Sequence, residues 1–276
     1  MKRIHRGEKM KKNVEQKKKK RLTVLKPEDV IRFNCNEKLD CFTRCCRDIT
    51  IFLTPYDVLR MKNALQISSG DFLAGYTATL IGDTGLPVVV LKMLDDDKKS
   101  CPFVKSSGCT IYPDRPWACR IYPLQPESTP LTEKARKAYY SVMEIPFCLG
   151  LKEDRTLTLR EYIEEQEIPV YMEMEALFKK ISTNERLLKE KITNKGILDM
   201  YYMACYDLDR FRRFVFESTF LGRFDIEPQT IEEIKSDDVA LYRFAIQWLE
   251  YGLLAQDVMK VKADVMAAKK QEMEFE

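Results

Sequence analysis

The sequence of 276 residues contains a single histidine, His5, which lies in a lysine- and arginine-rich run near its first residue. Catalytic Ser–His–Asp and Cys–His groupings need an imidazole held in a folded pocket, and terminal segments are usually poorly ordered. The same shortage excludes zinc sites that depend on histidine. Metal chemistry in this chain would therefore depend on cysteine thiolates, with carboxylates as a minor option.

Long hydrophobic runs are also missing, since no apolar stretch approaches the roughly 18 residues that a membrane-spanning helix requires. The first residues are basic but include no apolar segment of the kind found in signal peptides. We therefore expect a protein with no membrane partner that stays in the reducing cytoplasm. Closely spaced thiols in that compartment favour metal binding or redox catalysis over disulfides.

The charge is unevenly distributed along the chain. Residues 1–26 hold 12 Lys and Arg against 2 Glu, so the rest of the chain carries a net charge of −7 although the whole carries +3. We expect residues 1–26 to form a disordered basic tail, and the alternative is a tether to nucleic acid or another acidic surface. Nucleic acid is disfavoured, because no aromatic residues are interleaved among these charges for base stacking.

The composition changes near residue 150, where a part rich in cysteine and proline gives way to a part with long helical periodicity. We expect an α+β protein in which residues 27–150 form a small Cys-rich metal-binding domain with short strands and loops. A mainly helical C-terminal extension follows in residues 151–276. Five prolines in residues 95–128 exclude long helices from that segment.

Local signals place several elements. Thr54 followed by Pro55 predicts the start of a helix, and Thr158 with Glu161 forms a capping box before another. The other expected elements are a strand in residues 49–54, a helix around 72–76, a turn at 82–85, a strand over 88–93 and a helix in 170–192 after an interruption at Pro169.

Two amphipathic stripes are expected to be helices. Apolar residues between Ile197 and Val215 recur at alternating spacings of four and three, and those between Leu241 and Ala255 do the same. Packing against the core is the favoured interpretation of both stripes. The alternative is that these C-terminal helices bind an unidentified protein partner.

Eight of the nine cysteines lie in loops rich in turn residues, and they are the candidate metal ligands. They are Cys35, Cys41, Cys45, Cys46, Cys101, Cys109, Cys119 and Cys148. Cys205 instead lies beside an apolar stripe and is expected to pack in the core. Because zinc and iron–sulfur clusters take four thiolates per centre, eight cysteines could serve two centres, or one centre and reactive thiols. Redox thiols without a metal are the alternative.

Cys45 and Cys46 are adjacent in the sequence. In an extended backbone their side chains would point to opposite sides, so we expect them to serve different centres, or one to bind and the other to support.

Four arginines flank the cysteines in the sequence: Arg44, Arg47, Arg115 and Arg120. Their guanidinium groups are candidates to neutralise an anionic centre and to donate hydrogen bonds to sulfur. The alternative is that they form ordinary surface pairs with acids such as Asp48 and Asp114.

These motifs resemble the YkgJ-type cysteine-cluster family, over about residues 30–150. The resemblance rests on Phe33-Asn-Cys35, Cys41-Phe-Thr-Arg-Cys45-Cys46-Arg-Asp48, Leu53-Thr-Pro-Tyr-Asp57, Cys101-Pro-Phe103, Gly108-Cys-Thr-Ile-Tyr112 and Arg115-Pro-Trp-Ala-Cys-Arg-Ile-Tyr-Pro123. It implies a zinc- or iron-chelating domain in which the eight cysteines are the metal ligands. Of the two, we favour an iron–sulfur cluster over zinc.

Flagellin lysine N-methylases share this cysteine domain, so the resemblance also implies an alternative function, a metal-dependent transferase that uses S-adenosylmethionine. The sequence offers no Gly-rich strand–loop–helix suited to a nucleotide. Asp57, Tyr112 and Tyr122 are the acid or base candidates, and each has an ordinary capping or core role as its alternative. Whether the chain is an enzyme, a metal-binding module or an interaction protein stays open.

Overall fold

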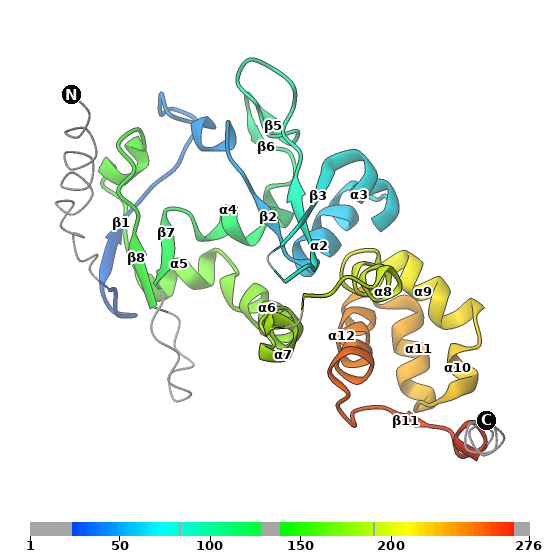
Figure 1. Ribbon diagram of the computed structural model, residues 1–276. Helices are drawn as coiled ribbons and strands as arrows, with labels where there is room; N and C mark the ends of the chain where they lie inside the picture. The colour runs from blue at the N-terminus through cyan, green and yellow to red at the C-terminus, as the bar shows by residue number, and fades with distance from the viewer. Residues whose placement is uncertain (1–23, 83, 128–138, 190, 268–276) are drawn as a thin grey trace, which may run out of the picture. The chain divides into compact units, whose positions relative to one another are not determined.

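The structure divides into two compact units. It is a computed structural model that describes residues 24–82, 84–127, 139–189 and 191–267 (Figure 1). Unit 1 comprises the chain up to Asn34 together with Tyr122–Tyr162, and unit 2 comprises Cys35–Ile121 together with the chain from Ile163 onward. His5 and nearly all of the expected basic tail lie outside the described residues. No helix in the described ranges is both long and apolar enough to cross a membrane.

Unit 1 contains two antiparallel strand pairs, β1 with β9 and β7 with β8. Its elements are β1 (Val30–Arg32), β7 (Leu124–Glu127), β8 (Tyr139–Val142), η3 (Leu149–Lys152) and β9 (Thr156–Thr158), followed by the start of α5 (Leu159–Glu165). The Asn34 amide donates to the Gly150 carbonyl at 3.0 Å. A Cβ at Gly150 would lie 2.9 Å from the Asn34 carbonyl oxygen, so only glycine permits this approach. The contact fixes the residues after Cys148 beside the end of β1.

The first part of unit 2 follows the local signals closely. Its elements are η1 (Arg44–Cys46), β2 (Phe52–Leu53), α2 (Pro55–Leu65), α3 (Ser69–Tyr76), β3 (Thr77–Ile81) and β4 (Pro87–Leu91). Thr54 and Asp57 form a full capping box at the start of α2, which confirms the predicted helix start. Ser68 caps α3, and β3 and β4 form the hairpin whose turn was predicted at 82–85. The sheet order is β2-β4-β3.

The proline-rich segment forms only short elements, as predicted. They are β5 (Val104–Lys105), β6 (Gly108–Cys109), η2 (Tyr112–Asp114) and α4 (Trp117–Ile121). The Trp117 amide donates to a carboxylate oxygen of Asp57 at 2.8 Å, which attaches α4 to the start of α2. Asp57 therefore satisfies donors from two helices at once.

The rest of unit 2 is helical, as the α+β expectation requires. Its elements are α6 (Ile168–Ser182), α7 (Glu185–Lys189), α8 (Lys195–Cys205), α9 (Leu208–Glu217), α10 (Phe220–Arg223), β10 (Phe224–Asp225), α11 (Pro228–Ser236), α12 (Asp238–Leu254) and β11 (Lys260–Val261). Figure 1 shows α12 beside α8, α9 and α11. Pro169 lies in the first turn of α6, whose N-cap, Glu167, has a left-handed φ of 53°.

The stripe from Ile197 to Val215 is two helices rather than one. Cys205 ends α8, and Asp207 caps α9 by accepting the Arg210 amide. The apolar faces of both helices still enter one core, where Tyr201, Phe211 and Val215 are fully or almost fully buried. Spacing alone could not show the break, because the periodicity continues across it.

A buried ion network ties the cysteine-bearing part to the helices. The Lys62 ammonium on α2 lies 2.9 Å from Asp238 and 3.4 Å from Asp209, and Arg212 contacts both acids. The Ser69 amide at the start of α3 donates to Asp209 at 2.7 Å. Because the Lys62 side chain is only 8% exposed, losing its partners would leave a charge poorly solvated.

Replacing Asp238 by Asn is expected to lower the free energy of unfolding by about 1–2 kcal/mol at pH 7. Burial opposes ionisation of this carboxyl, but hydrogen bonds from Arg212, Lys62 and Asn63 hold its pKa at about 2, below its ordinary 3.8. A lowered carboxyl pKa stabilises the fold above the unfolded value, and this contribution disappears as the pH falls from about 4 towards about 2. Urea unfolding at pH 7 and near pH 2 measures the difference.

The matched control for this variant is Asp199→Asn. Asp199 pairs with Arg210 at the surface, where the two side chains are 57% and 42% exposed. That change is expected to alter stability by no more than about 0.5 kcal/mol. Equal losses in the two variants at pH 7 would contradict a special role for the buried network.

Candidate metal centre

Cys45 and Cys46 lie on η1, a single turn of 3-10 helix. Thr43 precedes the turn with a left-handed φ of 61°, and the two sulfur atoms are 4.0 Å apart. The expected extended backbone is therefore wrong at this position. Adjacent side chains on a 3-10 turn are separated by about 120° rather than pointing to opposite sides, so the two thiols can face one site.

Backbone pairing brings Cys101 against this turn. The Cys101 amide donates to the Cys46 carbonyl at 2.8 Å, and Arg47 forms an antiparallel bridge with Ser100. Two segments more than 50 residues apart in the sequence thus lie side by side. This long-range contact is the step that joins the first group of cysteines to the second.

Cys109 and Cys119 are carried by the short elements that follow. Cys109 lies on β6, opposite Val104 of β5. Cys119 lies on α4, where its amide donates to the Pro116 carbonyl at 2.9 Å. Both cysteines pack against the same hydrophobic core as Cys46 and Cys101.

The thiols of Cys45, Cys46, Cys101, Cys109 and Cys119, which we call the thiol cluster, influence one another electrostatically. The hydrogen bond between Cys45 and Cys46 lowers the pKa of Cys45 and, with burial, raises the pKa of Cys46. Burial, together with the thiols of Cys101, Cys109 and Cys45, raises the pKa of Cys119 to about 12. Several of these thiols can ionise together only if a positive charge offsets their repulsion.

The remaining predicted ligands are Cys35, Cys41 and Cys148. Cys35 is exposed and Cys41 is half-buried, both at the start of unit 2. Cys148 is buried but belongs to unit 1. Cys205 is completely buried on α8, which confirms its predicted place in the core. Five members of the candidate ligand set are therefore neighbours, and metal binding by all eight cysteines stays a prediction.

The thiol cluster is not arranged as a finished coordination shell. Within the described residues, no three His, Cys, Asp or Glu side chains converge closely enough to hold one metal ion. The sulfur pair on η1 is spaced like two ligands of such a shell. Thiolates on a tetrahedral ion, each at about 2.3 Å from the metal, are separated by about 3.8 Å, close to the 4.0 Å between Cys45 and Cys46.

Arg115 and Arg120 are buried and bind backbone and amide oxygens. Arg120 donates to the carbonyls of Pro113, Arg115 and Gln166, and its guanidinium lies over the Tyr171 ring at 4.4 Å from the centroid. Arg115 donates to the Tyr112 carbonyl at 2.6 Å and to the Gln166 side chain.

The acids proposed as alternative partners are paired elsewhere. Asp114 binds Arg60, and Asp48 pairs with Lys99. Of the four arginines, Arg115 has a resolved effect on a thiol. Its charge counteracts the increase in the pKa of Cys109 that burial causes.

Two buried N–H donors of residues close to the cluster cysteines in the sequence have no partner among the described residues. They are the Arg47 Nε–H, next to Cys46, and the Trp117 Nε1–H, two residues before Cys119. An unsatisfied buried donor costs about 1–3 kcal/mol, so an acceptor is expected to face each. Sequence reasoning assigned no role to Trp117, although its place between Pro116 and Cys119 in the motif is a usable signal.

The acid or base candidates have structural surroundings. Asp57 is almost completely buried in the α2 cap, and burial raises its pKa to about 6 despite hydrogen bonds from Trp117 and Thr54. Tyr112 is 56% exposed with Arg115 stacked on its ring. Tyr122 belongs to unit 1, where its carbonyl accepts the Tyr162 hydroxyl. Each of these contacts accounts for the residue without a catalytic role.

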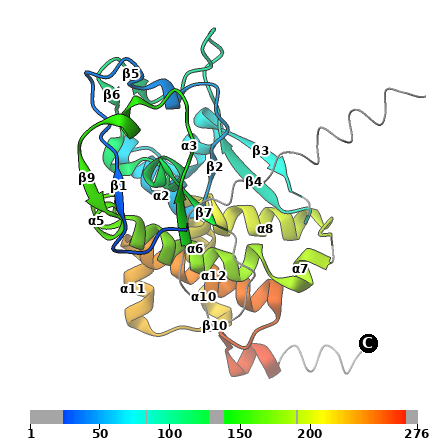
Figure 2. The same ribbon diagram turned by 90° about the vertical axis from the view of Figure 1, so that its left-hand side faces the viewer.

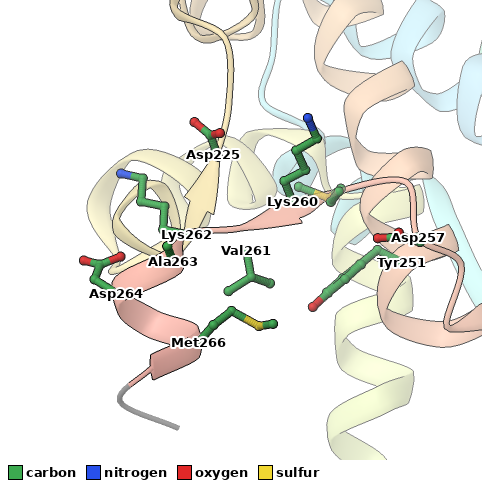
Figure 3. A pocket seen from close by; sticks show the side chains of 10 residues that line it. Asp225, Tyr251, Asp257, Lys260, Val261, Lys262, Ala263, Asp264 and Met266 are labelled. Carbon is green, nitrogen blue, oxygen red and sulfur yellow. The ribbon is translucent and has the colours of Figure 1, made fainter. Parts of the chain in front are cut away.

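Two open hollows elsewhere in the described residues are lined by no cysteine. One, of about 850 Å³, is shown in Figure 3 and is lined by Asp225, Tyr251, Asp257, Met259, Lys260, Val261, Lys262, Ala263, Asp264 and Met266. Its acids and lysines surround an apolar floor formed by Val261, Met266 and Tyr251. This mixture of charges favours no particular sign of ligand. The second hollow lies between α8, α9 and α12.

The comparison with protein families agrees with the thiol cluster. Residues 34–144 match the model of the CxxCxxCC family, described as a "putative zinc- or iron-chelating domain". The resemblance to a cysteine-cluster family is therefore shown for this segment. No significant match was found among the curated proteins or among the solved structures.

The CxxCxxCC domain covers seven of the eight candidate ligands. It includes all five members of the thiol cluster and also Cys35 and Cys41, but it ends before Cys148. Cys148 is thus set apart both by the extent of the domain and by its place in unit 1. The match specifies chelation of zinc or iron and names no enzymatic activity, so methyl transfer stays a prediction from the resemblance alone.

Proposed function

We propose that the CxxCxxCC domain of this protein holds one thiolate-ligated metal centre on the thiol cluster, and that this centre is an iron–sulfur cluster. The observation that carries the proposal is that five cysteines from η1, the Cys101 loop, β6 and α4 lie in one electrostatically linked neighbourhood. Ordinary core packing does not explain five thiols in one neighbourhood, several of which shift the pKa values of others.

The chemistry of the donor set fits such a centre. Thiolates are the preferred ligands of zinc and of iron–sulfur clusters. The pair on η1 is spaced for two bonds to one metal, and Cys101, Cys109 and Cys119 supply more than the two further ligands that a four-coordinate centre needs. One thiol of the cluster is then left over. We propose that this thiol, Cys35 and Cys41 support the ligands, since all three lie near them in the sequence. Metal binding would complete the shell and contribute to folding of the proline-rich segment.

The orphaned donors fit a thiolate-ligated centre, and an iron–sulfur cluster would offer them more acceptors than a single zinc ion. Arg47 Nε–H and Trp117 Nε1–H need acceptors, and either thiolate ligands or the sulfides of an iron–sulfur cluster would provide them. Sulfides add acceptors that a zinc ion lacks. When bound, an iron–sulfur cluster would supply one-electron chemistry, with a potential that depends on such hydrogen bonds and on solvent exposure.

Anaerobic purification of the full chain, followed by elemental analysis and absorption spectroscopy, tests this function. We expect iron together with acid-labile sulfide, and a broad visible absorption that bleaches on reduction. If the protein contained zinc in place of iron, the proposed metal centre would stand, but it would be a zinc site and not an iron–sulfur cluster. Protein that contains neither metal, and takes up neither when supplied with zinc, or with iron and sulfide, would refute the metal centre itself.

A further inference from the structure

The sheet β2-β4-β3 has one unprotected edge. Its two edge strands differ, because β2 has only two residues and runs into Pro55, whereas β3 has five residues. Natural edge strands are usually blunted by charges, by proline or by shortness. The sequence of β3, Thr77-Ala-Thr-Leu-Ile81, has none of these protections. Figure 2 shows β3 and β4 as long neighbouring arrows.

The hydrogen-bond pattern identifies which groups of β3 face outward. The Lys92 amide donates to the Tyr76 carbonyl at 2.8 Å, and the Gly82 amide donates to the Leu86 carbonyl at 3.0 Å. The even-numbered residues of β3 therefore turn their backbone groups towards β4, since bonding alternates along an antiparallel strand. The N–H and C=O groups of Thr79 and Ile81, and the carbonyl of Thr77, point away from the sheet.

Several apolar side chains around this edge are exposed. Phe52, Ala78 and Val90 are aligned across the three strands on the face away from the core, with Leu80 and Val88 beside them. Phe52 is 58% exposed, Leu80 is 49% exposed, and Ile81, on the opposite face at the strand end, is 65% exposed. An apolar face that continues to an open edge is a template for strand addition.

We infer that β3 pairs antiparallel with β3 of a second copy of this chain, about a two-fold axis at Thr79. In that register Thr79 faces Thr79 of the other copy and Ile81 faces Thr77, so outward groups meet outward groups along the whole strand. Leu80 of one copy then lies beside Ala78 of the other, and the two apolar faces become continuous. The strand carries no charge that would select an acidic or basic partner. A second copy of the same uncharged strand can therefore pair with it without bringing a charge into the interface.

Sedimentation velocity of the full chain over a concentration series tests this dimer. We expect a weak monomer–dimer equilibrium, because one strand pair buries less surface than a stable interface does. Thr79→Pro removes an outward N–H from both copies and leaves the bonds to β4 intact, so it should weaken association by about tenfold or more. Thr79→Val keeps the N–H and should associate like the unchanged chain.

A second variant guards against misfolding of the proline variant. Ile81→Lys places a charge at the exposed edge and should weaken association to a similar extent, while melting temperature and metal content stay unchanged. A chain that is monomeric at every accessible concentration would overturn the inference. This holds even if the β3 edge binds a different protein. Undiminished association of both Thr79→Pro and Ile81→Lys would overturn it as well.

Discussion

Cys119→Ala protein is expected to lose its bound metal, whereas Cys205→Ala protein should retain it fully. Both thiols lie on helices, Cys119 half-buried and Cys205 buried, and the two changes remove the same atoms. Cys119 belongs to the thiol cluster, while Cys205 packs among core tyrosines such as Tyr201. Loss of a direct ligand should weaken metal affinity by at least about 100-fold, since changes just outside a ligand set already cost 10–100-fold. Elemental analysis after identical anaerobic purification measures the difference.

The same series separates the five neighbouring cysteines from the three others. Ala variants of Cys46 and Cys101 should behave like Cys119→Ala, and those of Cys35 and Cys148 should lose less metal. Equal loss in all eight variants would instead support the full set that the resemblance implies. Metal loss in Cys205→Ala matching that in Cys119→Ala would contradict the assignment, because Cys205 lies outside the CxxCxxCC domain.

Arg120→Ala is expected to lower the free energy of unfolding by about 3–5 kcal/mol. This side chain is 1% exposed and donates to the carbonyls of Pro113, Arg115 and Gln166, so its removal leaves several buried acceptors unpaired. It also ends the contact with Glu167 at 3.1 Å. Because these bonds connect the segment before Cys119 to α6, metal retention should fall together with stability.

The variant Arg120→Lys should not rescue this loss, since an ammonium group cannot reproduce the planar fork of donors that reaches several carbonyls. Arg160→Ala is the matched control, because Arg160 is 61% exposed and pairs with Glu28 at the surface. It should change stability by about 0.5 kcal/mol or less. If Arg120 instead acted on sulfur, Arg120→Ala would change the absorption or potential of the centre while leaving the unfolding midpoint unchanged.

Local chemistry was sufficient to predict much of the fold. The capping boxes at Thr54 and Thr158, and the proline-limited elements before residue 128, follow from side chains that satisfy neighbouring amides or remove them. The break before α9 also had a local signal, because Asp207 is a good N-cap, but the continuing apolar periodicity concealed it. Strand β3 was missed although β-branched Thr77, Thr79 and Ile81 alternate along it.

The candidate site was predictable in its residue types but not in its grouping. Spacing could not show that Cys101 pairs with the backbone of Cys46, because that contact depends on how distant segments fold together. Nor could it show the helical turn at Cys45, which begins with the left-handed conformation of Thr43. The predicted boundaries at residues 26 and 150 follow composition and stay predictions, while the compact units follow contacts such as that of β1 with β9.

X-ray absorption at the metal edge of the anaerobically purified protein tests the central claim most directly, because it reports the atoms bound to the metal. If the thiol cluster holds the centre, sulfur alone should fill the first shell. For zinc the metal–sulfur distance should be about 2.3 Å, and for an iron–sulfur cluster iron neighbours should appear as well. A first shell made mainly of nitrogen or oxygen would contradict the account, whatever the amount of metal bound.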